Sequence, residues 1–123
     1  MTSSATKIVR DYLDAMEARN LDLAKSYLSD NFTMTFPGNT VFSTPEELID
    51  WSKERYNSVG KTHERFDETG SGDEAAVYCF GTLHGKWPDG TPFDGIRFID
   101  RFTVTGDKLR DQRVWNDLAE AQN

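Results

Sequence analysis

With 123 residues, of which 37% are hydrophobic and 28% are charged, the chain has the size and composition of one folded domain, which excludes a disordered or two-domain protein. Its net charge of -7 argues against a main role on nucleic acid or on anionic membrane, because both need a basic protein surface. No stretch approaches a membrane span, the first residues do not resemble a signal peptide, and the single Cys79 cannot form an internal disulfide, so we expect a cytoplasmic protein.

The beginning of the chain carries helical patterns. From about Ser4 to Arg19 an apolar residue recurs every four positions, which predicts one face of an amphipathic helix; the repeating residues are Ile8, Tyr12 and Met16. Asn20 interrupts this pattern and can cap a second, short helix from Leu21 to Leu28. Two helices are therefore expected before the first strand.

A short strand and a third helix follow. Ser29–Asn31 has the composition of a turn, and Phe32–Phe36 alternates strictly between apolar and polar residues, as a half-buried strand does. In Thr44–Glu47 a threonine cap precedes a proline and then a glutamate, which is a strong signal for the start of a helix. This third helix should continue to about Ser58 and end before Gly60.

The second half of the chain predicts strands. Four segments are separated by turns rich in glycine, proline and aspartate: Thr62–Glu68, Ala75–Trp87, Phe93–Thr105 and Lys108–Asn116. The short connections imply antiparallel neighbours. Three helices followed by a long, curled sheet indicate an α+β fold, in which the helices cover one concave face of the sheet and leave a cavity beneath them.

Segments spread over nearly the whole chain have the order and content of a known superfamily: Ile8–Leu13, Asn20–Asp22, Tyr27–Met34, Phe98–Val104, Lys108–Arg110 and Val114–Asp117. They resemble the nuclear transport factor two-like superfamily, in particular its SnoaL-like (polyketide cyclase-like) and ketosteroid isomerase-like branches. The resemblance implies one domain over residues 1–123 with a cystatin-like cone, in which three N-terminal helices pack on a curved, mixed but mostly antiparallel sheet around a pocket. It also implies a homodimer through the outer sheet face, where Arg97, Ile99, Arg101 and Trp115 are expected.

A catalytic function would depend on Asp100. Period-two alternation places it on one strand face with Phe98, Phe102 and Val104. A carboxylate between two inward phenylalanines is costly to bury while charged unless a partner is present. By the resemblance, an acidic residue here acts as acid or base in SnoaL-like cyclases and as a neutral donor in ketosteroid isomerases. The alternative is a structural Asp100 that pairs with an arginine.

Tyr12 and Phe36 bear on the type of chemistry. By the resemblance, Tyr12 matches the tyrosine that donates to the oxyanion in ketosteroid isomerases, whereas spacing alone predicts a core residue. These isomerases carry a catalytic carboxylate in the first strand just before a proline, where this chain has Phe36, so steroid isomerisation by the usual mechanism is not expected. The Arg-x-Asp arrangement of limonene epoxide hydrolases is also missing, because Phe98 stands two residues before Asp100.

His84 is the candidate partner of Asp100. Strand alternation sets His84 on one face with Phe80 and Thr82. If that face is concave, His84 and Asp100 can meet on adjacent strands and form a proton-transfer pair; otherwise His84 is only a half-exposed residue near the strand's end. No metal site is expected from two histidines and one cysteine, since His63 lacks the second histidine of a zinc-binding helix.

The expected ligand-binding residues come from faces assigned to the pocket. In the last strand Gln112, Val114 and Asn116 share a face, and the two amides could orient a ligand. Trp51 on the third helix could line the pocket mouth, although core packing or a dimer surface is the default for a tryptophan. The full set of ligand-binding candidates is Phe36, Trp51, Phe80, Thr82, Phe98, Gln112, Val114 and Asn116.

Two functions stay open from the sequence. One is an enzyme of isomerase or cyclase-type lyase activity without a cofactor, with Asp100 as acid or base, His84 as helper and Tyr12 as oxyanion donor. Its substrate would be a small, largely apolar molecule with an oxygen function. The other is a non-catalytic ligand-binding or assembly domain of the same fold, which the missing carboxylate at Phe36 favours.

Overall fold

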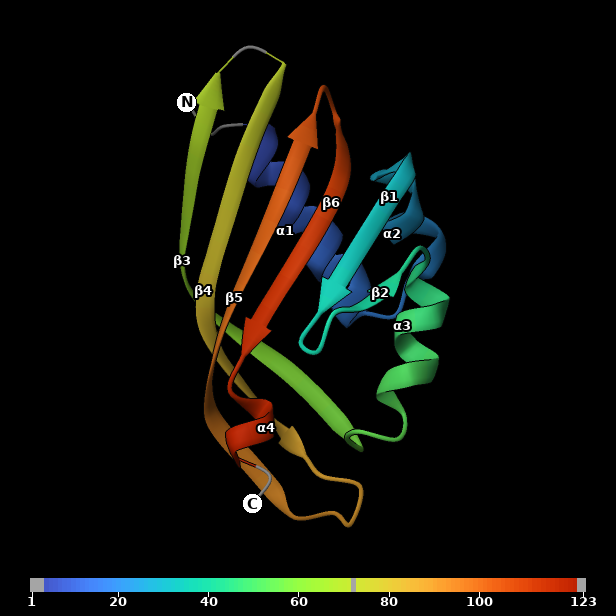
Figure 1. Cartoon of the computed structure of the whole chain (residues 1–123), viewed down its shortest axis with the longest axis vertical. Helices are drawn as coiled ribbons and strands as arrows, with labels where there is room; N and C mark the ends of the chain where they lie inside the picture. Colours follow the sequence, from blue (N-terminus) through green and yellow to red (C-terminus); the bar gives the residue numbers. More distant parts are fainter. Residues whose placement is uncertain (1–3, 72, 122–123) are drawn as a thin grey trace.

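The computed structural model describes residues 4–71 and 73–121 and confirms the expected α+β class (Figure 1). Along the chain the elements are α1 (Ser4–Glu17), α2 (Leu21–Ser26), β1 (Leu28–Phe36), β2 (Thr40–Phe42), α3 (Pro45–Ser52), β3 (Ser58–Ser71), β4 (Glu74–Lys86), β5 (Pro92–Thr105), β6 (Lys108–Asn116) and α4 (Leu118–Ala121). Figure 1 shows α1 running across the strands behind the sheet, with α2 and α3 on the side of β1 and β2. None of the helices in the described residues is long and apolar enough to span a membrane.

The strands form one sheet in the order β2-β1-β6-β5-β4-β3. The strands β3 to β6 are successive antiparallel neighbours, whereas β1 pairs with β6 in parallel and with β2 antiparallel. The sheet is therefore mixed and mostly antiparallel, as expected. Its long strands curve, so that the start of β3 approaches α3 (Figure 1).

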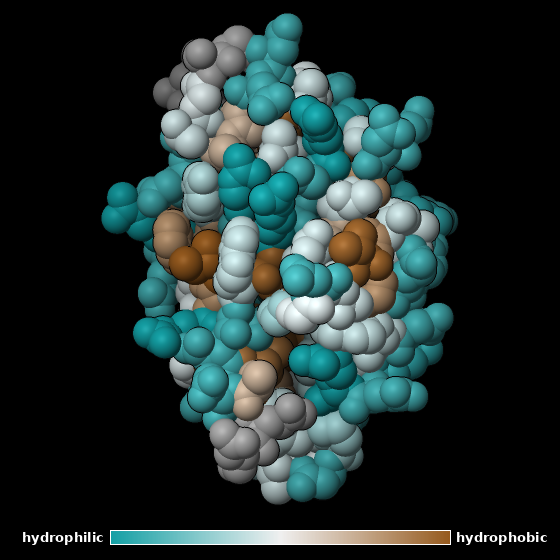
Figure 2. Space-filling view, in the orientation of Figure 1, coloured by the Kyte–Doolittle hydropathy of each residue, from teal (hydrophilic) through white to brown (hydrophobic). Residues whose placement is uncertain are grey.

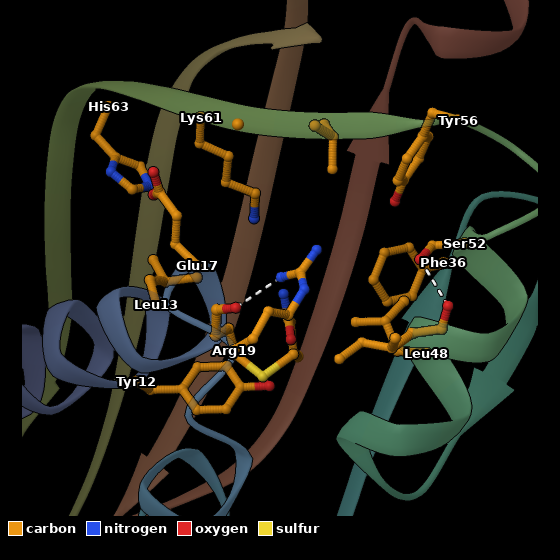
Figure 3. A pocket seen from close by; sticks show the side chains of 15 residues that line it. Tyr12, Leu13, Glu17, Arg19, Phe36, Leu48, Ser52, Tyr56, Lys61 and His63 are labelled. Carbon is orange, nitrogen blue, oxygen red and sulfur yellow. Dashed lines mark hydrogen bonds between the residues drawn. The ribbon is translucent and has the colours of Figure 1, made fainter. Parts of the chain in front are cut away.

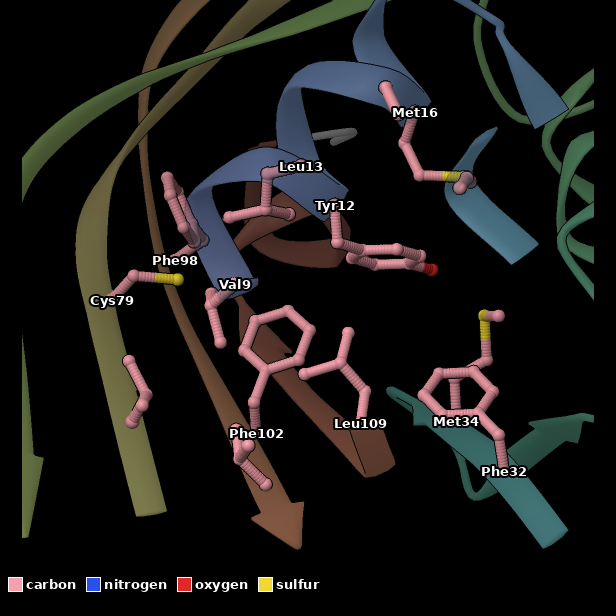
Figure 4. Close-up of a cluster of buried hydrophobic side chains, with 14 of the residues drawn as sticks. Val9, Tyr12, Leu13, Met16, Phe32, Met34, Cys79, Phe98, Phe102 and Leu109 are labelled. Carbon is pink, nitrogen blue, oxygen red and sulfur yellow. The ribbon is translucent and has the colours of Figure 1, made fainter. Parts of the chain in front are cut away.

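The core lies between α1 and the concave face of the sheet. Tyr12 of α1 packs edge-on against Phe102 of β5, with ring centroids 6.0 Å apart, and at 6.3 Å from Phe32 of β1 (Figure 4). Val9 and Leu109 are fully buried beside them. Burial of such side chains contributes about 1.5–3 kcal/mol each and fixes α1 across the sheet.

The third helix is shorter than expected, while its start is as predicted. The side chains and backbone of Thr44 and Glu47 form a capping box. The helix ends at Ser52, and the chain turns there, since Arg55 and Tyr56 both donate to the carbonyl of Ser52. Asn57 then donates a hydrogen bond to the carbonyl of Lys86, at 2.8 Å, next to the start of the β3–β4 pairing. Gly60 consequently lies within a strand, and the prediction that it ends a helix is wrong.

The first strand is longer than expected. The predicted turn at residues 29–31 belongs to β1, which pairs with β6 from Leu28 onward and shifts register before Thr33. The turn composition reflects this irregularity rather than a chain reversal. The short elements β2 and α4 were not expected, and the second helix ends at Ser26 instead of Leu28.

Candidate functional site

A cavity of about 120 Å³ lies between the end of α1, α3 and the first half of β3 (Figure 3). Leu13, Met16, Phe36 and Leu48 give it apolar walls. A second, smaller cavity of about 60 Å³ shares Phe36, Lys61 and other residues with the first. Together the two cavities form the candidate site of this protein.

Asp100 borders the smaller cavity and is paired with a lysine. Its side chain has 0% exposure, and its Oδ2 lies 2.5 Å from Nζ of Lys61, whose side chain is 28% exposed. A buried carboxylate requires such a partner, because an isolated charge loses its hydration without compensation. The partner is thus a lysine on the inner face, and the arginine expected as the alternative partner is wrong.

Lys61 is held in its protonated form. Burial lowers the pKa of the Lys61 ammonium. The negative charge and the hydrogen bond of Asp100 raise this pKa, and the net shift is upward. The ammonium also lies 5.0 Å from the ring centroid of Phe98. Lys61 therefore presents a positive charge at the boundary of the two cavities (Figure 3).

Tyr12 is buried at the cavity wall with a free hydroxyl. Only 1% of the residue is exposed, and its hydroxyl has no hydrogen-bond partner among the described residues. Burial raises the pKa of Tyr12, and the negative charge of Asp100 adds to that rise. The tyrosine thus stays protonated and can donate a hydrogen bond to a bound molecule.

Two further polar side chains line the cavity without a partner. Oε1 of Gln112 and Nε2 of His63 are buried, and neither atom forms a hydrogen bond with the part of the chain described here. Burial, followed by the positive charge of Lys61, lowers the pKa of His63, against the raising effects of Asp100 and Glu17. His63 is therefore a neutral imidazole at neutral pH.

His84 does not meet Asp100. The buried side of β4 carries Cys79, which is the strand partner of Asp100, and His84 is exposed on the opposite side. Phe80 and Thr82 share that outer face, where they are paired with Ile99 and Arg97. The alternation of β4 was predicted correctly, but the face was assigned the wrong way round, so the proton-transfer pair and these two ligand contacts are wrong.

The other expected ligand-binding residues lie near the cavities. Phe98, Val114 and Asn116 border the smaller one, although Asn116 also accepts a hydrogen bond from the backbone of Leu118 at 3.1 Å and so caps α4. Gln112 borders the larger one. The remaining two, Phe36 and Trp51, pack against each other with ring centroids 5.4 Å apart, and Trp51 borders the smaller cavity.

Residues of β3 and of the helix ends were missed from the sequence. Lys61 and His63 line the cavity because β3 alternates from Val59 onward. Lys61 was missed because the strand was expected to begin only at Thr62, whereas His63 lay within the expected strand and was considered only as a metal ligand. Arg19 and Tyr56 also line the cavity and follow the ends of α1 and α3, where no periodic pattern identifies an inward residue.

Comparison with protein families and solved structures is consistent over almost the whole chain. The family model of the SnoaL-like domain matches residues 9–112. No curated protein matches the sequence.

Three solved structures share the fold at low sequence identity. A nuclear transport factor 2-like protein of unknown function from Burkholderia pseudomallei is 16% identical, with 98% of this chain and 95% of that chain covered and a TM-score of 0.80. A ketosteroid isomerase-like protein from Shewanella frigidimarina is 17% identical, with coverage of 92% and 95% and a TM-score of 0.75. A SnoaL-like, polyketide cyclase-like protein from Jannaschia is 19% identical, with coverage of 96% and 88% and a TM-score of 0.71.

Proposed function

Because the chain belongs to the family of SnoaL-like domains, we propose that it binds a small, largely apolar molecule with an oxygen function and transfers a proton next to that oxygen. One observation carries the proposal: unpartnered polar atoms of Tyr12, His63 and Gln112 line one cavity beside the Lys61–Asp100 pair. The cavity volume, about 120 Å³, supports a ligand with a single ring, since an engineered cavity of about 150 Å³ holds benzene.

The proposed chemistry assigns a role to Asp100, to Tyr12 and to Lys61. Oδ2 of Asp100 is bound to Lys61, whereas Oδ1 has no partner among the described residues and would accept the proton from the carbon beside the carbonyl. The hydroxyl of Tyr12 would donate to the oxygen as it becomes negative, and the ammonium of Lys61 would stabilise the same charge. The proton then returns from Asp100 to the product.

The nature of the related proteins supports the reaction type. By name, the neighbours from Shewanella and Jannaschia are ketosteroid isomerase-like and SnoaL-like polyketide cyclase-like, and the isomerase or cyclase type of reaction is proposed for this chain on that likeness. Phe36 borders the cavity and, by the family resemblance, stands where ketosteroid isomerases have their usual base, so the proposed base is Asp100 and steroid isomerisation by the usual mechanism is not proposed.

Hydrogen–deuterium exchange tests this function together with its non-catalytic alternative. Cyclohexanone and 4-oxocyclohexanecarboxylate are incubated with the protein in D₂O, binding is measured by calorimetry, and exchange beside the carbonyl is followed by NMR. We expect the protein to accelerate the exchange, and Asp100→Asn to lower the rate at least about 100-fold, because general bases contribute about 10²–10⁴-fold. Arg113→Met, on the exposed outer face, serves as the control.

Each other outcome has a definite meaning. Binding without accelerated exchange would establish a non-catalytic ligand-binding domain. Exchange that persists unchanged in Asp100→Asn would remove Asp100 from the mechanism. If neither compound binds, the proposed function is wrong.

We also propose that two copies associate through the outer sheet face, as the family resemblance implies. This face exposes Ile99 and Trp115, which border a groove of about 570 Å³. Figure 2 shows hydrophobic groups near the middle of the molecule among hydrophilic ones.

The cytoplasmic location stays a prediction, which rested in part on the single cysteine, Cys79. This thiol is buried, and burial together with the negative charge of Asp100 raises its pKa to about 12.

A further inference from the structure

We infer that the ligand of this cavity is an anion, a single-ring compound with a carboxylate group that lies against Arg19, Arg55 and Tyr56. This inference rests on the proposed function, because it names the charge of the molecule that the cavity binds. It follows from three cationic side chains that converge on one end of the site, of which only Lys61 forms an ion pair with a carboxylate of the described residues.

The first unneutralised cation is Arg19, directly after α1. Its φ of 59° is in the left-handed region, which is uncommon for a residue other than glycine. In this conformation the guanidinium folds back, donates to the carbonyl of Met16 at 2.6 Å and lines the cavity (Figure 3). No carboxylate of the described residues forms an ion pair with it.

The second is Arg55, just after α3. Its guanidinium lies 4.3 Å from the ring centroid of Trp51, and its Nε is buried without a hydrogen-bond partner in the described part of the chain. Arg55 borders the smaller cavity together with Lys61 and Asp100. Stacking on a tryptophan fixes the planar guanidinium in one orientation, which suits bidentate recognition of a carboxylate.

Tyr56 marks the place where these charges act together. Burial raises the pKa of its hydroxyl, while the positive charges of Lys61, Arg55 and Arg19 oppose that rise. Tyr56 borders both cavities, and its hydroxyl points into the site (Figure 3). Since Asp100 already balances Lys61, the other two positive charges near this hydroxyl are left without an ion pair among the described residues.

The opposite end of the cavity has a different character. Glu17 lies beside His63, away from Tyr56 (Figure 3), and its charge acts on that imidazole. The cavity is therefore polarised, with its positive end at Tyr56. In a chain with a net charge of -7, such a local positive excess is not a consequence of the overall composition.

The test compares an acid with its neutral analogue. Binding of 4-oxocyclohexanecarboxylate and of 4-oxocyclohexanecarboxamide is measured by calorimetry, because the two probes differ in charge and hardly in shape. We expect the acid to bind at least about tenfold more tightly, as one charge-assisted contact would provide, and its affinity alone to fall when the ionic strength is raised.

Substitutions locate the effect. Arg55→Met keeps an apolar side chain over Trp51, and Arg19→Met keeps an unbranched, flexible side chain, so both variants should fold. Each should weaken the acid about tenfold and leave the amide within about twofold. Arg113→Met removes the same charge from the outer face and should change neither affinity.

Several results would overturn the inference. If acid and amide bind the native protein equally, the ligand is not selected by charge, although the proposed function still stands. If Arg113→Met weakens the acid as much as Arg55→Met does, the effect is one of total charge rather than of this site. If neither probe binds, the proposed function and this inference are both wrong.

Discussion

At the scale of single residues, Asp100 and Lys61 each depend on the other's charge. Strand alternation predicted correctly that Asp100 points inward between Phe98 and Phe102. It could not name the partner, because Lys61 is 39 residues away and lies on a strand that is not adjacent to β5. A contact across an intervening strand depends on sheet curvature, which local sequence patterns do not contain.

The pair gives a stability prediction. Lys61→Met leaves the buried carboxylate of Asp100 without a partner and should lower the free energy of unfolding by about 3–5 kcal/mol at neutral pH. In Lys61→Met/Asp100→Leu no buried charge remains, so more than half of this loss should be recovered. Urea denaturation measures both, with Lys86→Met, an exposed lysine of β4, as a control expected within about 0.5 kcal/mol of the native protein.

Two results would contradict this view of the pair. A single variant as stable as the native protein would mean that Asp100 finds other stabilisation or becomes neutral without cost. A double variant less stable than the single one would mean that the ion pair itself, rather than the compensation of a buried charge, stabilises the fold.

At the scale of elements, the side chains of β4 explain why His84 was predicted on the wrong face of the sheet. Alternation gives the period of a strand but not which face is concave. In β4 the larger aromatic residues Tyr78 and Phe80 lie on the outer face, and small residues lie inside. A Cβ on Gly81 would lie 1.9 Å from the carbonyl oxygen of Thr62 and 3.1 Å from the ring of Phe98, so the interior at this point is already filled by β5 and β3.

The helix ends show a similar limit. Capping signals correctly predicted the start of α3, because they act through neighbouring residues. The end of α3 is followed by a turn that leads into the pairing of β3 with β4, and the turn after α1 has Arg19 in a left-handed conformation. These tertiary features place Arg19, Arg55 and Tyr56 at the site, and for this reason the cationic end could not be predicted from the sequence.

At the scale of the whole molecule, the family resemblance correctly predicted the helices over a mixed sheet. A cavity beneath the helices was also expected, and one is found there. Its polar lining was predicted in part, since Tyr12 and Gln112 border it whereas His84 does not. The arrangement of the helices on the sheet follows from the order of the elements along the chain. The set of side chains that line the cavity follows instead from the register of the strands and from the turns after the helices.

The outer face leads to a prediction about assembly. Trp115, with 52% exposure, would be buried if two copies meet through the sheet. Trp115→Glu should then convert a dimer into a monomer in sedimentation equilibrium, because a desolvated carboxylate opposes association. Leu23→Glu, at an exposed position (44%) on α2 and outside the sheet, is the matched control. A native protein that sediments as a monomer would contradict the proposed dimer.

The candidate site under α1, with its two cavities, and the larger groove on the outer face differ in character. An NMR titration of isotope-labelled protein with 4-oxocyclohexanecarboxylate decides between them most directly. The account predicts saturable shifts that are largest at the methyl group of Met16, at Tyr56 and Lys61, and at the side-chain amide of Gln112. Shifts centred on Ile99 and Trp115, or no saturable shifts at all, would contradict the claim that this protein binds its ligand in the cavity.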